Sequence, residues 1–286
     1  MLRSELYRLR RRWMPWIMLG LIVVAAFGFY FLIWASVNAQ LQAVKGGAIP
    51  APPGGTGQFD EVLREIAPDR VPNFGIGLVS GIGSVMLIVF AASHVGTEFG
   101  WGTFRTLLAH GASRSGFLVS KAVSLLLYAL VFMIVGSLAA IGASYTVSAI
   151  AGISAGSGVD LAEVVRVAGK SGYTFLPYMA LALAIAAWSK SAGAGIAAGL
   201  VVYFAEGIVA SILVSLNKDY AQVVNWGLSR NASALTRTTT TAAGQDPSFS
   251  TLPDPTQAAI VLGLYTLIFV ALAYWRLRSR DVTVGG

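Results

Sequence analysis

The chain has 286 residues, of which 56% are hydrophobic and only 12% are charged. Soluble domains carry about twice that charged fraction, so the composition excludes a soluble globular protein and indicates an integral membrane protein. The net charge of +7 would suit nucleic acid, but the positions of the basic residues favour inner membrane loops instead, and the absence of cysteine excludes disulfides and thiol chemistry.

Residues 1–15 are predicted to form a basic amphipathic helix that lies on the inner membrane surface. One helical face of this segment is apolar, with Leu2, Leu6, Leu9 and Trp13. Five arginines supply positive charge: Arg3, Arg8, Arg10, Arg11 and Arg12. Such a helix binds anionic lipid, and Pro15 suits the first turn of the helix that follows.

Six apolar runs then predict six membrane-spanning helices, because about 17–25 residues cross the hydrocarbon core. They cover residues 16–36, 73–93, 121–144, 172–188, 192–215 and 258–275. A cleaved signal peptide is the alternative for the first run, which is longer than the roughly 7–15 residues of a signal sequence core. Glycines one turn apart predict close helix contacts, at Gly77 and Gly81 and at Gly195 and Gly199. The expected fold is an all-α membrane protein.

Three longer polar connections, residues 37–72, 145–171 and 216–257, are assigned to the outer side. Within the first, residues 60–67 predict a short helix whose apolar stripe rests on the outer membrane surface. That stripe consists of Phe59, Val62, Leu63 and Ile66.

The distribution of charge predicts the orientation. The termini and connections assigned to the inner side hold twelve of the 20 basic residues and only three acidic ones, Glu5, Glu98 and Asp281. The basic residues are Arg3, Arg8, Arg10, Arg11, Arg12, Arg105, Arg114, Lys121, Lys190, Arg276, Arg278 and Arg280. A basic excess marks the cytoplasmic side, so both termini are expected in the cytoplasm.

The inner connection at residues 94–120 is long enough to offer a folded surface to a partner. Trp101, Phe104 and Leu108 fall on one helical face with Arg105 beside it. Ser113 is predicted to cap a second helix whose first turn carries Arg114. Glu98 is expected to form a structural ion pair with Arg105 or Arg114.

Glu206 is the one acidic residue inside a predicted span. A carboxylate in hydrocarbon costs about 2.5–3.5 kcal/mol, so Glu206 must face protein or water. Two interpretations stay open: a residue that lines a pathway for a polar or cationic substrate, or a helix–helix hydrogen bond.

Metal and nucleotide sites receive little support. His94 and Glu98 are spaced i, i+4 near His110, but the chain has only two histidines. Gly169-Lys170-Ser171 resembles the end of a phosphate-binding loop, yet Val164 stands where the pattern needs glycine. We expect no metal, no cofactor and no nucleotide hydrolysis in this chain.

The segment after the second span resembles the permeases of type-2 ABC exporters. The matching residues are Glu98, Gly102, Thr103, Arg105, Leu107, Leu108, Ser113, Arg114 and Lys121. The basic first helix and the six spans also agree, so the resemblance covers nearly the whole chain. One departure is that the family often has proline before the Ser-Arg pair, where this chain has Gly111-Ala112.

The resemblance implies a transport subunit of the plasma membrane without enzymatic activity of its own. A coupling helix near residues 99–110 would dock on a separate subunit that binds ATP and Mg²⁺, with Trp101 and Phe104 as apolar anchors. Residues 1–15 would be the interfacial elbow helix. Two permeases, identical or paralogous, would enclose the pathway among membrane lipids, and no nucleic acid would be involved.

Two other functions remain as alternatives. An intramembrane enzyme, such as a CAAX-type protease or a lipid-modifying enzyme, would use Glu206, although both histidines lie at or outside a span end and no Glu-Glu pair exists. A membrane anchor or sensor that transports nothing is the other alternative. The substrate of a transporter is not identified by any pattern in the chain.

Overall fold

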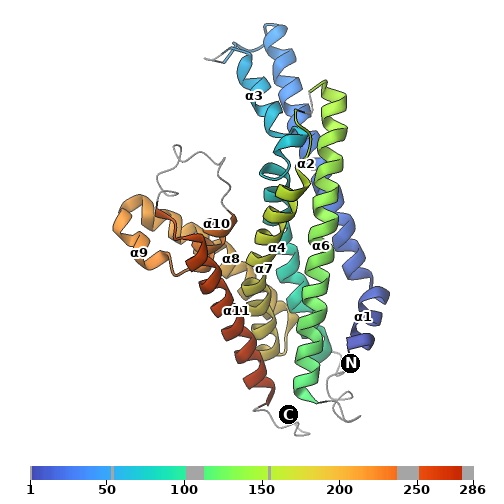
Figure 1. Cartoon of the computed structure of the whole chain (residues 1–286), viewed down its shortest axis with the longest axis vertical. Helices are drawn as coiled ribbons and strands as arrows, with labels where there is room; N and C mark the ends of the chain where they lie inside the picture. Colours follow the sequence, from blue (N-terminus) through green and yellow to red (C-terminus); the bar gives the residue numbers. More distant parts are fainter. Residues whose placement is uncertain (1, 53–54, 101–112, 154–155, 237–250, 279–286) are drawn as a thin grey trace. The chain divides into compact units, whose positions relative to one another are not determined.

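The computed structural model describes residues 2–52, 55–100, 113–153, 156–236 and 251–278, and these are helical without any strand (Figure 1). Six helices in these ranges are long and apolar enough to cross a membrane. They are α2 (Trp13–Lys45), α4 (Phe74–Gly100), α6 (Arg114–Ala151), α7 (Leu161–Ser189), α8 (Ala192–Leu216) and α11 (Pro255–Arg278). Each overlaps one predicted run, so the all-α fold with six spans is confirmed and the chain is a multi-pass membrane protein.

Several of these helices are longer than the apolar runs that predicted them. α2 has 33 residues and α6 has 38, and at about 1.5 Å per residue both exceed the hydrocarbon thickness of about 30 Å. The apolar run marks only the part inside hydrocarbon, whereas the helix continues until a residue stops it. α6 ends at Ala151 because Gly152 adopts a left-handed backbone, with φ of 68°.

Shorter helices fill the connections. They are α1 (Leu2–Arg11), α3 (Gly57–Glu65), η1 (Pro68–Arg70), η2 (Lys218–Tyr220), α9 (Ala221–Val224) and α10 (Leu228–Thr236). The helix predicted at residues 60–67 corresponds to α3. Residues 216–257 differ from the expected loop, because η2, α9 and α10 occupy their first half and α10 packs on α8 and α11. Buried polar side chains hold this region, and periodicity does not reveal them.

Side-chain and backbone caps fix several helix starts. The Ser113 hydroxyl accepts the backbone N–H of Gly116 at 3.1 Å, which confirms the predicted cap of α6. At α11, the Asp254 carboxylate accepts the N–H of Thr256 at 2.8 Å, and this hydrogen bond lowers the pKa of Asp254. Both helices therefore begin where a capping residue ends the preceding connection.

The chain forms two compact units. The first contains Met1–Pro15, Ser84–Leu130 and Lys170–Gly286, and the second contains Trp16–Gly83 and Val131–Gly169. We call them unit 1 and unit 2.

In unit 2, the core joins α2, α3 and α6. Tyr30, Ile66, Ala143 and Val147 are its buried members, and Leu63 packs against them. The apolar stripe of α3 therefore rests on protein at Leu63 and Ile66, which corrects the expectation that it lies on the membrane surface. The stripe looked like a membrane-facing surface because a helix pattern shows which residues are apolar but not what covers them.

In unit 1, α8 packs closely on α4 and α7. A methyl group at Gly195 would lie 2.7 Å from the Ala182 carbonyl oxygen, and one at Gly199 would lie 2.5 Å from Ile88 Cγ2. The predicted contact face at these two glycines is confirmed. In contrast, a methyl group at Gly77 or Gly81 would meet no atom within 4 Å, so the close helix packing predicted at this pair is not found in the part of the chain that the structure describes.

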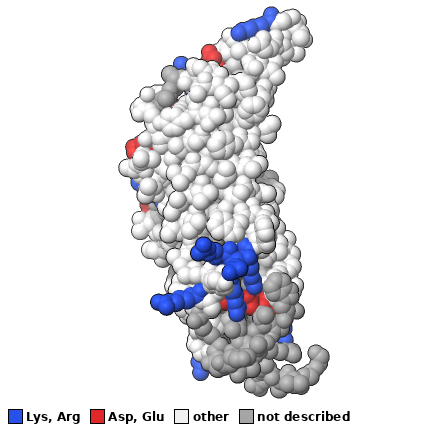
Figure 2. All heavy atoms as spheres, turned by 90° about the vertical axis from the view of Figure 1, so that its right-hand side faces the viewer, with Lys and Arg blue, Asp and Glu red and all other residues white. Residues whose placement is uncertain are grey.

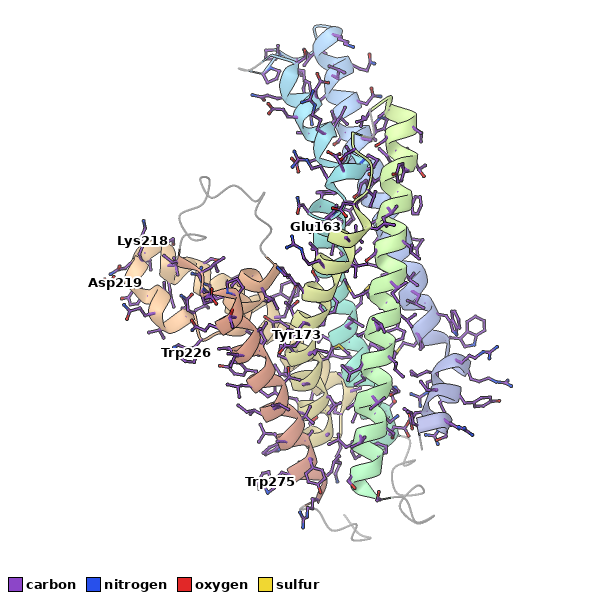
Figure 3. All side chains as sticks on the ribbon, in the orientation of Figure 1. Glu163, Tyr173, Lys218, Asp219, Trp226 and Trp275 are labelled. Carbon is purple, nitrogen blue, oxygen red and sulfur yellow. The ribbon has the colours of Figure 1, made fainter. Side chains whose placement is uncertain are left out.

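The remaining helices of unit 1 are joined by polar contacts. Tyr173 of α7 donates its hydroxyl to the Ala259 carbonyl of α11 at 2.9 Å (Figure 3). Near the other end of α11, Arg276 lies 4.9 Å from the centre of the Trp188 ring, a cation–π contact between α11 and the end of α7.

Candidate functional site

Helix α1 turns an acidic side chain toward protein. Glu5 is only 3% exposed, and Leu9, one turn later on the same face, is buried as well. The apolar face predicted for this segment is buried only at Leu9, whereas Trp13 is 82% exposed. The membrane contact of that face stays a prediction, whereas Glu5 turns toward protein because its charged partner lies on another helix.

That partner is Lys121, near the start of α6. Its ammonium group lies 2.8 Å from Glu5 Oε2 and 3.0 Å from Glu98 Oε1, and the side chains of Lys121 and Glu98 are fully buried. Glu98 comes from the last turn of α4. Because an unpaired buried charge is costly, this bridge joins α1, α4 and α6 at one point.

Two arginines add positive charge at the edge of this buried ion cluster. Arg12 Nη2 lies 3.1 Å from Glu98 Oε1, and Arg8 Nη1 lies 3.4 Å from Glu5 Oε1 and 3.6 Å from Glu98 Oε1. Both arginine side chains are partly exposed. Figure 2 shows basic side chains gathered on one face of the molecule. The cluster thus has a fully buried centre at Lys121, and partly exposed arginines lie around it.

His94 of α4 adds a hydrogen bond beside the cluster. Ser124 donates its hydroxyl proton to the Lys121 carbonyl at 2.8 Å. His94 Nε2, 3.0 Å from the Ser124 oxygen, is therefore the donor of that second bond. The ring also stacks on Phe90, which stacks in turn on Tyr128. His94 contacts α6 through this network.

A further bond holds the junction between α1 and α2. The Tyr128 hydroxyl donates to the Pro15 carbonyl at 2.9 Å in a buried setting. Pro15 is the last residue of the segment expected to be the elbow. The elbow segment is therefore joined to α6 twice, at Glu5 and at Pro15.

Glu206 of α8 is partly buried and engages the protein. Its Oε1 accepts the backbone N–H of Ser229, in the first turn of α10, at 3.0 Å. A carboxylate at a helix N-terminus satisfies unpaired amides and matches the helix dipole. Gly227 leaves the room for it, since a methyl group there would collide with the carboxylate. The geometry is that of a helix–helix hydrogen bond, and a role in a substrate path stays a prediction.

Buried polar side chains hold the start of α10. Arg230 Nη2 donates to the carbonyl and the hydroxyl of Thr251, at 2.9 and 2.8 Å, and Nε donates to Asn225 Oδ1 at 3.0 Å. Asn231, with no exposed surface, donates its amide to the carbonyls of Asn225 and Gly227. These bonds explain why a polar segment folds here.

The family assignment rests on a long match. A family model described as "Protein of unknown function (DUF2705)" matches residues 77–283, more than half of the chain. The chain belongs to the DUF2705 family. No curated protein matches it.

The DUF2705 match includes the two cluster members that come from α4 and α6. It runs from α4 past the end of α11 and so includes Glu98, Lys121 and Glu206, whereas α1 with Glu5 precedes it. Sequence reasoning missed the roles of Glu5 and Lys121. The available signal was weak: one acid in a basic segment and one lysine at the edge of an apolar run.

The residues expected to dock on a partner are not placed by the structure of this DUF2705 chain. Trp101, Gly102, Thr103, Phe104, Arg105 and Leu108 lie outside the described residues, as does His110. Arg114 opens α6, but its side chain is not described. Glu98 forms ion pairs as expected, yet its described partners are Arg8, Arg12 and Lys121.

Proposed function

We propose that this chain is the permease subunit of an ATP-binding cassette exporter in the plasma membrane. Two permeases, identical or paralogous, form the substrate pathway, and a separate subunit that binds ATP and Mg²⁺ drives it. The proposal takes the resemblance of residues 98–121 as its starting point. Both termini lie in the cytoplasm in this scheme, where α1 meets anionic lipid.

The contact between Glu98 and Lys121 is the observation that supports the proposal most. These residues flank the expected coupling segment, and their 3.0 Å ion pair joins the two ends of that segment. Breaking a buried pair by removing one partner costs about 3–5 kcal/mol. A push on the coupling segment therefore moves the adjoining ends of α4 and α6 together.

The elbow segment would move with them. Glu5 binds the same lysine, and Arg12 binds the same glutamate. The buried ion cluster holds α1, α4 and α6 together. Such a rigid connection suits a transport subunit with no energy source of its own, because motion of the partner is then transmitted to all three helices.

Co-purification tests the proposal. The full chain is isolated from its own cells through a tag, and an ATP-binding subunit is expected to be recovered with it. Trp101→Ala combined with Phe104→Ala is expected to abolish recovery of the partner, because buried aromatic anchors carry much of an interface's binding energy. Trp226→Ala is the matched control, since Trp226 is an exposed tryptophan of another connection, and it should leave recovery unchanged.

Measurement of ATP hydrolysis complements the co-purification. ATP hydrolysis by the partner is expected to change when the wild-type chain is present in liposomes and not when the double variant is present. Transport by the chain alone, without ATP, would contradict the proposal. The intramembrane enzyme gains no support from the described residues, because the Glu206 carboxylate is engaged by the Ser229 amide.

A further inference from the structure

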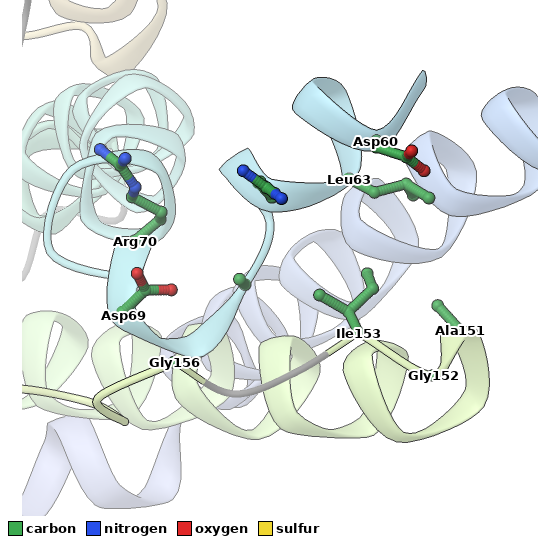
Figure 4. A pocket seen from close by; sticks show the side chains of 10 residues that line it. Asp60, Leu63, Asp69, Arg70, Ala151, Gly152, Ile153 and Gly156 are labelled. Carbon is green, nitrogen blue, oxygen red and sulfur yellow. The ribbon is translucent and has the colours of Figure 1, made fainter. Parts of the chain in front are cut away.

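A charged pocket lies in unit 2, beside α3, η1 and the C-terminal end of α6 (Figure 4). Its volume of about 480 Å³ is within the range of about 300–1,000 Å³ typical of small-molecule sites. The lining residues lie at 60–70 and 151–156, outside the predicted apolar runs. A ligand therefore reaches the pocket from water.

Four charged side chains line this pocket: Asp60, Arg64, Asp69 and Arg70. None of the four makes an ion pair or a side-chain hydrogen bond with any residue that the structure describes. Asp60 and Arg64 are spaced i, i+4 on α3, a spacing that favours pairing within a helix.

An exposed pair elsewhere in unit 2 shows the contrast. Arg166 and Glu163 are also one turn apart on a helix, and they form a two-point ion pair with N–O distances of 2.7 and 2.6 Å. The pocket charges have equally short sequence separations but remain unpaired in the described chain. Two guanidinium groups and two carboxylates are thus available to a ligand.

The walls of the pocket are fixed by the fold. The buried Ser144 hydroxyl donates to the Ile66 carbonyl at 2.7 Å, which holds the corner between α3 and η1 against α6. After the end of α6, the Ile153 N–H donates a hydrogen bond to the Ser148 carbonyl at 3.0 Å. The Ile153 side chain packs on the core of unit 2. A pocket held this way loses little entropy when a ligand binds.

A glycine brings the backbone close to one acid of the pocket. Gly156 has a φ of +55°, and a methyl group there would lie 3.2 Å from the Asp69 carboxyl carbon. A side chain at position 156 would therefore crowd Asp69 and also require a strained backbone. Glycine at position 156 therefore leaves room for the Asp69 carboxylate at the wall of the pocket.

We propose that this pocket binds a small water-soluble zwitterion, such as an amino acid or a short peptide with free termini. The planar guanidinium groups of Arg64 and Arg70 match a carboxylate or phosphate, which they bind through paired hydrogen bonds. The carboxylates of Asp60 and Asp69 match an ammonium group. The four charges sum to zero, which favours a zwitterion over a multiply charged anion. The pocket binds its ligand whether or not the chain transports.

Calorimetric titration of the full chain with triglycine tests this inference. The chain is held in nanodiscs of phosphatidylglycerol, which contain no zwitterionic headgroups. The variants Arg64→Gln, Arg70→Gln and Asp69→Asn are each expected to weaken binding by about tenfold or more, because each removes a charge-assisted contact. The control Arg166→Gln should stay within about twofold of wild type. Unchanged melting temperatures establish that all variants fold.

Further ligands separate the chemical classes. Triglycine blocked at either end is expected to lose binding, because both charges are needed. Glycerophosphoethanolamine binding by the same residues, with triglycine inactive, would keep the zwitterion class and assign it to a lipid headgroup. Inorganic phosphate binding as tightly as triglycine would overturn the zwitterion assignment. Absence of binding by every ligand up to about 10 mM, or full binding by the arginine variants, would overturn the pocket itself.

Discussion

Lys121 is a fully buried cation that meets one carboxylate from α1 and another from α4. A lysine in this position is stable only because its partners are also buried and close. Arg8 and Arg12 supply further positive charge at the rim, so Lys121 is not the sole counterion of Glu98. Its particular role is to connect α6 with both α1 and α4.

Replacing Lys121 tests that role. Lys121→Met keeps most of the side-chain volume but leaves two buried carboxylates without their shared partner, and it is expected to destabilise the fold by about 3–5 kcal/mol. Thermal melting of the purified chain in detergent measures the loss. The triple variant with Glu5→Gln and Glu98→Gln added should melt closer to wild type, because no charge is then stranded.

A surface pair provides the comparison. Arg166→Gln removes an exposed ion pair on α7, and its effect on stability is expected to be small because water screens both charges. A Lys121→Met chain that melts like Arg166→Gln would contradict the importance of the buried cluster.

Among the helices, α8 makes its closest contacts at glycines, which have no side chain. Gly195 and Gly199 let α8 approach α4 and α7 so closely that an added methyl group would overlap their atoms. Side chains with little bulk allow this packing in membranes, where apolar surface gives no advantage over lipid. Gly77 and Gly81 have the same spacing on α4 but no neighbour within reach of a methyl group.

Alanine substitution separates the two glycine pairs. Gly199→Ala is expected to destabilise the chain by about 1–3 kcal/mol, because the new methyl group overlaps Ile88 and forces α8 away. Gly77→Ala is the matched control and should be neutral or slightly stabilising, since alanine favours helix. Denaturation in mixed micelles measures both, and equal loss by the two variants would contradict the α8 packing.

Helix α10 depends on a cap from another helix. Glu206→Leu removes the acceptor of the Ser229 amide and is expected to cost about 1 kcal/mol, as loss of an N-cap does. Amide hydrogen exchange in α10 should accelerate, while Glu206→Gln, which keeps an oxygen acceptor, should protect most of it. Unchanged exchange in the leucine variant would leave the substrate path as the better explanation for Glu206.

For the whole molecule, the orientation in the membrane links the two proposals. The orientation predicted from the basic excess would place residues 94–120 in the cytoplasm, where an ATP-binding subunit would dock. It would place residues 60–70 and 151–156, which line the charged pocket, outside the cell. The buried ion cluster belongs to unit 1 and the charged pocket to unit 2. Each can therefore be tested by substitutions that do not disturb the other.

Labelling of an engineered cysteine tests the orientation. The chain contains no native cysteine, so Thr106→Cys supplies one thiol in the expected coupling segment. A reagent that cannot cross the bilayer is expected to react only after cells are opened, whereas Gly57→Cys, at the start of α3, should react in intact cells. Labelling of position 106 from outside would invert the orientation and contradict the docking proposal.

Hydrophobic runs by themselves determined the all-α class and the six spans, because crossing hydrocarbon demands a long uncharged helix whatever its neighbours are. The cap at Ser113 and the α8 contact face were also readable, since both depend on local spacing. Only the tertiary structure decided that Glu5 turns inward to Lys121, that Glu206 caps α10, and that four charges of unit 2 share a pocket. The first two features join residues distant in the chain, and the pocket forms only where the end of α6 lies beside residues 60–70. No periodic pattern records which helix lies beside which.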